Sequence, residues 1–239
     1  MLHGAERDAF DLSFALPSEC ADRLAAGDAD IGIVPVVEVA RQKLDYFPET
    51  GIACHGPVRS ILLVSKAPLR DIRTLAADAG SRTSVMLARI ILAERYGVEP
   101  KITSQPADLA SMLGASDAAL VIGDAALRIE PSSLPFETLD LGGEWNTLTG
   151  LPMVFAVWGG RNIDRRYAQA FVESCRFGRQ QIAEIAREQA PIRQIPEELA
   201  NEYLTRHIVF ELGRRDHQGM KLYLDQAARF EKLNEAAAV

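Results

Sequence analysis

The chain has 239 residues, of which 48% are hydrophobic and 25% charged, a composition typical of a globular protein with one large domain or two lobes. Its formal net charge of -7 disfavours binding to nucleic-acid phosphates. No apolar run is long enough to span a bilayer and no export signal is recognisable, so we expect a cytoplasmic protein with no membrane partner. Three cysteines and four histidines lie at wide spacings, which predicts neither a metal site nor a disulfide framework.

The first predicted elements are a strand, a helix and a second strand. Apolar side chains alternate over residues 10–16, which is typical of a strand. Pro17 and Ser18 then begin a short amphipathic helix, with Ser18 as its N-cap, and Gly27 ends it. Residues 30–35 form a short apolar run that predicts a buried strand. Because the order is strand, helix, strand, we expect the two strands to pair in parallel.

A second block of elements covers the middle of the chain. Residues 60–65, 75–77 and 118–122 are apolar or small, and each predicts a short strand. The turn formed by residues 81–84 leads into a helix whose apolar residues recur at helical spacing. Gly97 is the expected C-cap of that helix.

The last third of the chain is predicted to return to the first block and then to become helical. Residues 151–158 form an apolar run that predicts a strand. Apolar residues at helical spacing predict helices over 168–186, 196–212 and 219–233. Alternating strands and helices followed by a helical tail indicate an α/β protein, but this pattern does not identify a ligand.

Six short segments carry a more specific signal through their order and spacing. They are 17–24 (PSECADRL), 29–35 (ADIGIVP), 56–60 (GPVRS), 81–84 (SRTS), 117–124 (DAALVIGD) and 149–152 (TGLP). Together they resemble the chorismate dehydratase family of the futalosine route to menaquinone. The resemblance runs from about Phe10 to Trp158 and continues more weakly through the helical tail.

The resemblance implies a two-lobed α/β fold of the periplasmic-binding-protein-like type II class, with a C-terminal helical segment. Lobe 1 would contain residues 1–61 and 153–239, and lobe 2 would contain residues 62–152. The family normally begins with another strand and a loop that carries an Asn in a Leu-Asn-x-x-Pro-Leu setting. Residues 1–8 hold no counterpart, so we expect lobe 1 without that N-terminal strand.

The implied reaction is loss of water from chorismate to give 3-[(1-carboxyvinyl)oxy]benzoate. The partner is therefore a small-molecule substrate held between the lobes, and no metal, nucleotide or redox cofactor is implied. A homodimer is left open. Loss of water makes the ring aromatic, so the protein must mainly orient the substrate, assist proton removal and stabilise the departing hydroxide.

By resemblance, Ser60 is the catalytic hydroxyl, and the turn formed by Gly56, Pro57 and Val58 contacts the substrate. From the residues alone, the favoured interpretation of Ser60 is a serine at the start of a strand whose hydroxyl bonds to the backbone. Replacing Ser60 with alanine separates the two interpretations, because only a catalytic serine is needed for turnover.

The turn formed by residues 81–84 is a second part of the predicted site. Ser81, Arg82, Thr83 and Ser84 lie at a strand-to-helix junction, where free backbone N–H groups and the positive helix end suit a carboxylate. Ordinary N-capping by Ser81 or Thr83 is the alternative, and both roles can hold together.

Gly123 and Asp124 follow the predicted strand 118–122, and the carboxyl ends of parallel strands commonly face ligands. Gly123 would let a substrate approach the backbone closely. Asp124 either caps the following helix or contacts the substrate. An ionised Asp124 beside an anionic substrate would have to bind the substrate hydroxyl or pair with a base such as Arg128.

Two other functions stay open. One is a non-catalytic small-anion-binding protein of the same fold. The other is the related dihydroxynaphthoate synthase, which acts on a cyclic futalosine derivative and which the 56–60 segment resembles less. Incubation with chorismate, followed by mass spectrometry for loss of water, distinguishes these alternatives.

Overall fold

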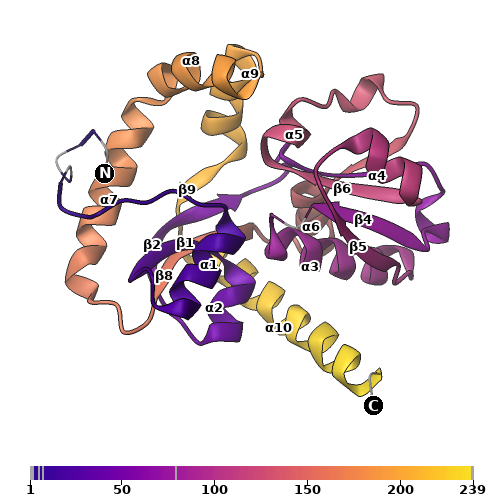
Figure 1. Cartoon of the computed structure of the whole chain (residues 1–239), viewed down its shortest axis with the longest axis horizontal. Helices are drawn as coiled ribbons and strands as arrows, with labels where there is room; N and C mark the ends of the chain where they lie inside the picture. Colours follow the sequence, from indigo (N-terminus) through magenta and orange to yellow (C-terminus); the bar gives the residue numbers. More distant parts are fainter. Residues whose placement is uncertain (1–2, 5, 7, 79, 238–239) are drawn as a thin grey trace.

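Nine strands form two separate sheets in the part of the chain that the structure describes (Figure 1). That part is residues 3–4, 6, 8–78 and 80–237 of a computed structural model. The first sheet has the order β1-β8-β2-β9 and the second has the order β5-β4-β6-β3-β7. The strands are β1 (Ile31–Pro35), β2 (Asp45–Cys54), β3 (Ile61–Ser65), β4 (Thr74–Asp78), β5 (Lys101–Gln105), β6 (Ala118–Ile122), β7 (Glu137–Asp140), β8 (Met153–Gly160) and β9 (Val209–Glu211).

Helices cover both sheets and form the C-terminal segment. The α-helices are α1 (Pro17–Ala26), α2 (Val36–Gln42), α3 (Arg82–Ile91), α4 (Leu109–Ala115), α5 (Gly123–Leu127), α6 (Leu141–Thr149), α7 (Ala168–Gln180), α8 (Ile182–Arg193), α9 (Glu197–Glu202) and α10 (Arg214–Ala237). Single turns are η1 (Leu69–Asp71), η2 (Leu92–Tyr96), η3 (Pro131–Ser133), η4 (Arg165–Tyr167) and η5 (Tyr203–His207). Within the described residues, no helix combines the length and the apolar character needed to cross a membrane.

The first sheet corrects two predictions. Residues 10–16 do not form a strand, and β1 pairs with β8 in antiparallel register instead. Alternating apolar residues favour a strand only where one face is covered, yet Phe14 is 75% exposed here and Leu16 is 57% exposed. Phe10 packs against the rings of Tyr167 and Phe171 instead of against a neighbouring strand.

The helix α1 starts two residues earlier than an N-cap at Ser18 predicts, and Ser18 is not its N-cap. Leu16 occupies the cap position, Pro17 is the first helical residue, and the Leu16 N–H donates to the Glu19 carboxylate at 3.1 Å. Pro17 is well suited to this place because its fixed φ fits a helix start that needs no donor. The predicted C-cap is confirmed, since Gly27 has a φ of +82°.

The second sheet confirms the three predicted strands around 60–65, 75–77 and 118–122. β4 pairs in parallel with β5 and β6, whereas β3 is antiparallel to β6 and β7. Alternate residues of β3 enter two cores: Leu63 joins the core beneath α3, and Leu62 joins the smaller core beneath α4 and α5. Because both faces are buried, the strand sequence is continuously apolar and does not alternate.

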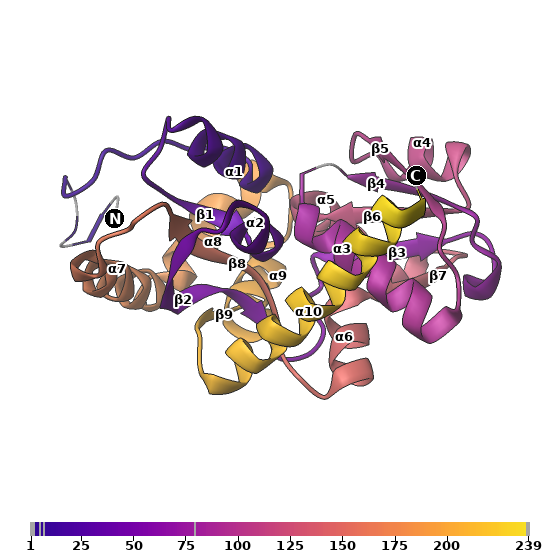
Figure 2. The same cartoon turned by 90° about the horizontal axis from the view of Figure 1, so that it is seen from below.

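The two sheets are linked by two crossing segments and by one long helix. The chain passes from β2 to β3 through residues 55–60 and returns from α6 to β8 through residues 150–152. Helix α10 packs against β8, α2 and α3. It therefore contacts the half of the molecule around the first sheet and the half around the second sheet, and Figure 2 shows it extending across both. The family resemblance places Ile61 in lobe 1, whereas in the structure Ile61 begins β3 of the second sheet. The proposed lobe limits stay a prediction, because α10 packs against both halves.

The helical tail is more broken than predicted. The helix expected over 168–186 is interrupted at Gln181, whose backbone has left the helical region, so α7 and α8 are separate. The helix expected over 196–212 is wrong for its last part, because β9 pairs with the free edge of β2. Backbone pairing with an unpaired sheet edge outweighs the helical spacing there. The helix expected over 219–233 is confirmed and begins earlier, at Arg214.

Candidate functional site

Three chain segments meet at one edge of the second sheet. β3 starts there at Ile61, while β4 and β6 end there at Asp78 and Ile122. Ile61 lies opposite Ile122, and the Gly123 N–H donates to the Ser60 carbonyl at 2.8 Å. Since β6 lies between β3 and β4, Ser60 and the start of the 80–84 turn are about two strand spacings, or roughly 10 Å, apart.

The loop that precedes Ser60 is held by Asp140, a residue that the sequence did not single out. One Asp140 oxygen accepts from the Val58 N–H at 2.9 Å and the other from the Arg59 N–H at 2.6 Å. Asp140 is also the N-cap of α6, because it accepts from the Gly143 N–H at 3.0 Å. The Pro57 carbonyl oxygen forms a hydrogen bond with His207 Nδ1 at 2.9 Å.

Replacing Asp140 with alanine is expected to lower the free energy of unfolding by about 3 kcal/mol, since three backbone donors lose their acceptor. Chemical denaturation measures this loss. Asp108 caps α4 through the single donor Ser111 N–H and is the matched control, for which a much smaller loss is expected. Equal losses in the two variants would contradict a clamping role for Asp140.

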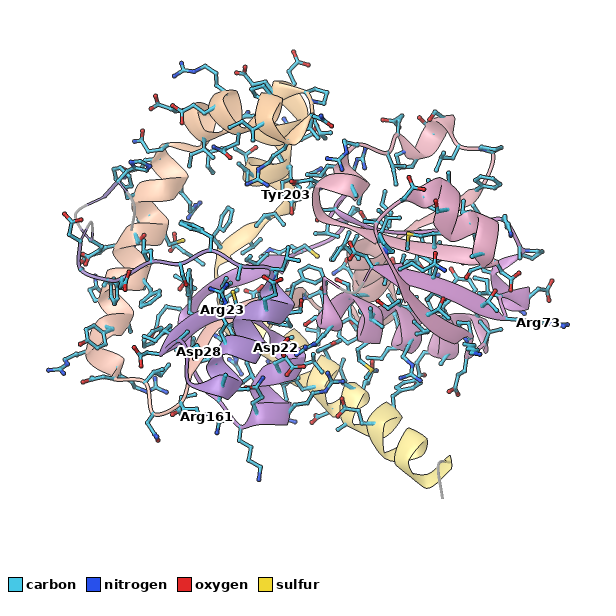
Figure 3. The ribbon with its side chains drawn as sticks, in the orientation of Figure 1. Asp22, Arg23, Asp28, Arg73, Arg161 and Tyr203 are labelled. Carbon is cyan, nitrogen blue, oxygen red and sulfur yellow. The ribbon has the colours of Figure 1, made fainter. Side chains whose placement is uncertain are left out.

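Ser60 is buried, and its side chain is bonded to a phenol. It is 4% exposed, and its Oγ accepts a hydrogen bond from the Tyr203 hydroxyl at 3.0 Å. Tyr203 begins η5, and Figure 3 labels it where the C-terminal helical segment meets the second half. Among the described residues no hydrogen bond joins the Ser60 side chain to the backbone, which was the alternative interpretation of this residue. Burial raises the pKa of Tyr203, so the phenol stays protonated at neutral pH.

The 81–84 turn is both a helix cap and a candidate ligand site. Ser81 caps α3: its Oγ accepts from the Ser84 N–H at 3.2 Å and lies 2.8 Å from the Ser84 Oγ. Thr83 is fully buried, and its Oγ1 has no hydrogen-bond partner among the described residues. A buried hydroxyl without a partner costs free energy, and a ligand oxygen at the α3 N-terminus would provide one.

Arg82 forms ion pairs with two carboxylates, those of Asp22 and Glu38, on helices that pack beside the first sheet. Its guanidinium donates to both oxygens of Asp22, at 2.8 and 3.0 Å, and lies 3.5 Å from Glu38. Asp22 is on α1 and is labelled in Figure 3, so Arg82 links α3 to the other lobe. The sequence offered no signal for this pairing, because the partners are 60 residues apart.

Glu38 is the buried member of this cluster. Its carboxylate accepts from Arg41 at 2.9 Å and from Gln42 at 3.0 Å. Burial alone would raise the pKa of Glu38, but the hydrogen bonds from Gln42 and Arg41 and the charge of Arg82 outweigh it, so the pKa lies below its ordinary value.

We expect the Glu38→Gln variant to be less stable than the wild type at neutral pH, and the difference to shrink as the medium becomes acidic. A lowered carboxyl pKa stabilises the fold above the unfolded-state pKa, and this stabilisation disappears as pH falls through the folded-state pKa. Urea denaturation between about pH 7 and pH 3 measures it. Glu184→Gln, which breaks an exposed pair with Arg187, is the control. A stability difference that is constant with pH would contradict the prediction.

Gly123 and Asp124 differ in what they can contribute. Gly123 has a φ of +60°, and a Cβ placed there would meet nothing within 4 Å, so its backbone borders open space. Asp124 forms an ion pair with Arg193 of α8 at 2.8 Å, whereas Arg128 donates to the Arg193 carbonyl. Asp124 thus faces the helical tail, and Arg193, not Arg128, is its charged partner.

Of two cavities in the described part of the chain, one is lined by no predicted site residue and the other by one of them, Arg82. A cavity of about 820 Å³ between α7, η5 and β9 is lined by Leu204 and Ile208 among others, but by no predicted site residue. A cavity of about 240 Å³ includes Arg82 with Val85 and Met86. Ser60, Thr83 and Ser84 are each less than 5% exposed. A ligand can therefore reach these hydroxyls only if the structure around them opens.

Comparisons with known proteins agree with this architecture. A family described as menaquinone biosynthesis has a model that matches residues 1–229. A curated chorismate dehydratase from Thermus thermophilus is 27% identical over 243 residues, covering 93% of this chain and 89% of that protein.

Two solved structures share the fold. A protein from Archaeoglobus fulgidus is 15% identical, with a TM-score of 0.66, over 92% of this chain and 85% of that one. The periplasmic aliphatic sulphonate binding protein SsuA from Escherichia coli is 17% identical, with a TM-score of 0.59, over 92% of this chain and 76% of that one. The expected periplasmic-binding-protein-like α/β fold is confirmed.

Proposed function

Because this chain belongs to the menaquinone biosynthesis family, we propose that it is a chorismate dehydratase that releases water to form 3-[(1-carboxyvinyl)oxy]benzoate. The observation that carries the proposal is the position of Ser60, the 81–84 turn and Gly123 along one sheet edge. A small ring acid needs a donor for its hydroxyl, a positive helix N-terminus for its carboxylate and a backbone that the ring can approach closely. Such a biosynthetic enzyme would work in the cytoplasm.

The proposed chemistry assigns separate tasks to the two ends of this edge. The α3 N-terminus, together with the unpartnered Thr83 hydroxyl, would hold a substrate carboxylate. The Ser60 hydroxyl would donate to the ring hydroxyl as it departs. The spacing of roughly 10 Å between the two ends leaves room for one six-membered ring with its substituents. Gly56, Pro57, Val58 and Gly123 would border this ring.

Proton removal does not require a protein base in this scheme. The ring hydrogen next to the departing hydroxyl leaves as a proton, and the proposed acceptor is the carboxylate of the substrate's own enolpyruvyl side chain. Aromatisation of the ring drives the step. The protein then contributes orientation and exclusion of water, which agrees with a serine that is 4% exposed.

Incubating the purified protein with chorismate and following the products by mass spectrometry tests the proposal. We expect chorismate to disappear and an aromatic acid lighter by one water to accumulate in proportion to protein concentration. Unchanged chorismate at high protein concentration would refute the dehydratase assignment.

A second candidate is binding of a small organic anion without chemistry. The fold shared with a sulphonate-binding protein and the fully buried hydroxyls favour it. Calorimetric binding of chorismate without any product would select it. Turnover of a cyclic futalosine derivative, with no effect on chorismate, would select the dihydroxynaphthoate synthase instead.

A further inference from the structure

The hydrogen bond between Tyr203 and Ser60 joins residues that are 143 positions apart in the chain. A serine hydroxyl has one hydrogen and two lone pairs. Because the Tyr203 hydrogen occupies one lone pair of Ser60, the hydrogen of Ser60 itself remains available for another acceptor. The phenol therefore restricts the directions in which the serine can donate.

The position of this phenol is fixed by the turn that carries it. η5 is a single π-turn, and such turns often occur at functional sites. It is closed by the Ile208 N–H, which donates to the Tyr203 carbonyl at 3.1 Å. His207, at the other end of the turn, holds the Pro57 carbonyl at 2.9 Å. The turn thus contacts the 56–60 loop at two points, one of which is Ser60.

The surroundings of Tyr203 keep it a donor. Its ring packs against Leu127 and its neighbours in the cluster formed with the helical tail, and also against the main core. Burial raises the pKa of Tyr203, while the hydrogen bond to Ser60 lowers it and the charge of Asp124 raises it, with a net upward shift. Asp124, whose charge acts on the phenol, is itself paired with Arg193 at 2.8 Å.

We propose that Tyr203 is a positioning residue that orients the Ser60 hydroxyl toward the departing oxygen of the substrate. This inference rests on the proposed function of Ser60 and adds a residue from the C-terminal helical segment to the site. It explains why a tyrosine hydroxyl from this segment is buried against a serine at the start of β3. Without the phenol, Ser60 would rotate among its staggered positions and donate in the productive direction only part of the time.

The test uses Tyr203→Phe, Ser60→Ala and the double variant, with chorismate as substrate. Tyr203→Phe removes only the hydroxyl, so we expect kcat to fall about 10- to 100-fold while KM changes less than about threefold. Tyr96→Phe is the matched control, because the Tyr96 hydroxyl bonds to Glu144 at 3.3 Å, outside the site. Its kcat should equal that of the wild type.

The double variant separates positioning from general structural support. If Tyr203 acts through Ser60, adding Tyr203→Phe to Ser60→Ala lowers kcat no further. An equal loss in both backgrounds, or an unchanged kcat in Tyr203→Phe, overturns the inference while leaving the dehydratase assignment intact. A wild-type protein that does not convert chorismate refutes the proposed function itself, so the two failures are distinguishable.

Discussion

The Ser60→Ala variant is expected to dehydrate chorismate about 100- to 1,000-fold more slowly than the wild type while remaining folded. The substitution removes the one side-chain donor that the sheet edge offers at the start of β3. It also leaves the partly buried Tyr203 hydroxyl without its acceptor, which costs about 1 kcal/mol of stability. Initial rates measured by product formation, together with thermal unfolding, quantify both effects.

A buried serine at the opposite end of the same strand provides the control. Ser65 is 2% exposed and donates to the Ala67 carbonyl at 2.7 Å, so Ser65→Ala also removes one buried, bonded hydroxyl from β3. We expect a similar loss of stability and an unchanged kcat. If both variants lose activity equally, the effect belongs to the strand and not to Ser60.

Gly219→Ala is expected to lower the free energy of unfolding by about 3 kcal/mol or more. A Cβ at position 219 would lie 2.0 Å from the Pro152 carbonyl oxygen, so α10 would have to move away from the crossing segment 150–152. The same carbonyl accepts a hydrogen bond from Trp145 Nε1 at 3.0 Å, so moving it away from the new Cβ would strain or break that bond. One turn further along α10, Tyr223 bonds to the Thr83 carbonyl, and this contact would loosen as well.

Gly178→Ala is the matched control, because Gly178 lies inside helix α7 and a Cβ there meets nothing within 4 Å. Alanine favours a helix over glycine by about 0.5–1 kcal/mol, so this variant should be slightly more stable than the wild type. Denaturant unfolding of both variants measures the contrast. A Gly219→Ala protein as stable as the wild type would show that α10 is not held closely to the crossing segment.

Three strands of the second sheet, β3, β4 and β6, could be predicted because each is a short run of apolar or small residues, most of which are buried. The strand expected over 10–16 and the helix expected through 212 failed for a common reason. Local spacing reports what a segment could form, whereas the presence of a partner decides what it forms. β9 pairs with the edge of β2, whereas residues 10–16 pair with no strand.

The candidate site divides in the same way. The cap formed by Ser81 and the open backbone at Gly123 follow from local sequence. The partners of Ser60 and Arg82 do not, because Tyr203 and Asp22 come from distant segments brought close only by the fold. The sequence therefore indicates which residues start or end the elements at this site, but it does not indicate which distant side chains contact them.

The contacts that link the parts around the two sheets are unequal on the two sides of the molecule. On the side of α5 and α8, Leu127 belongs to a small cluster with Ile195 and three alanines of the tail, and the Asp124–Arg193 pair is partly exposed and worth at most about 1 kcal/mol. Helix α10 lies on the opposite side (Figure 1). Its residues Tyr223 and Phe230 are buried in the main core. We expect α10 to be the pivot and the α5–α8 seam to part first, so that the mouth for incoming molecules forms beside Tyr203.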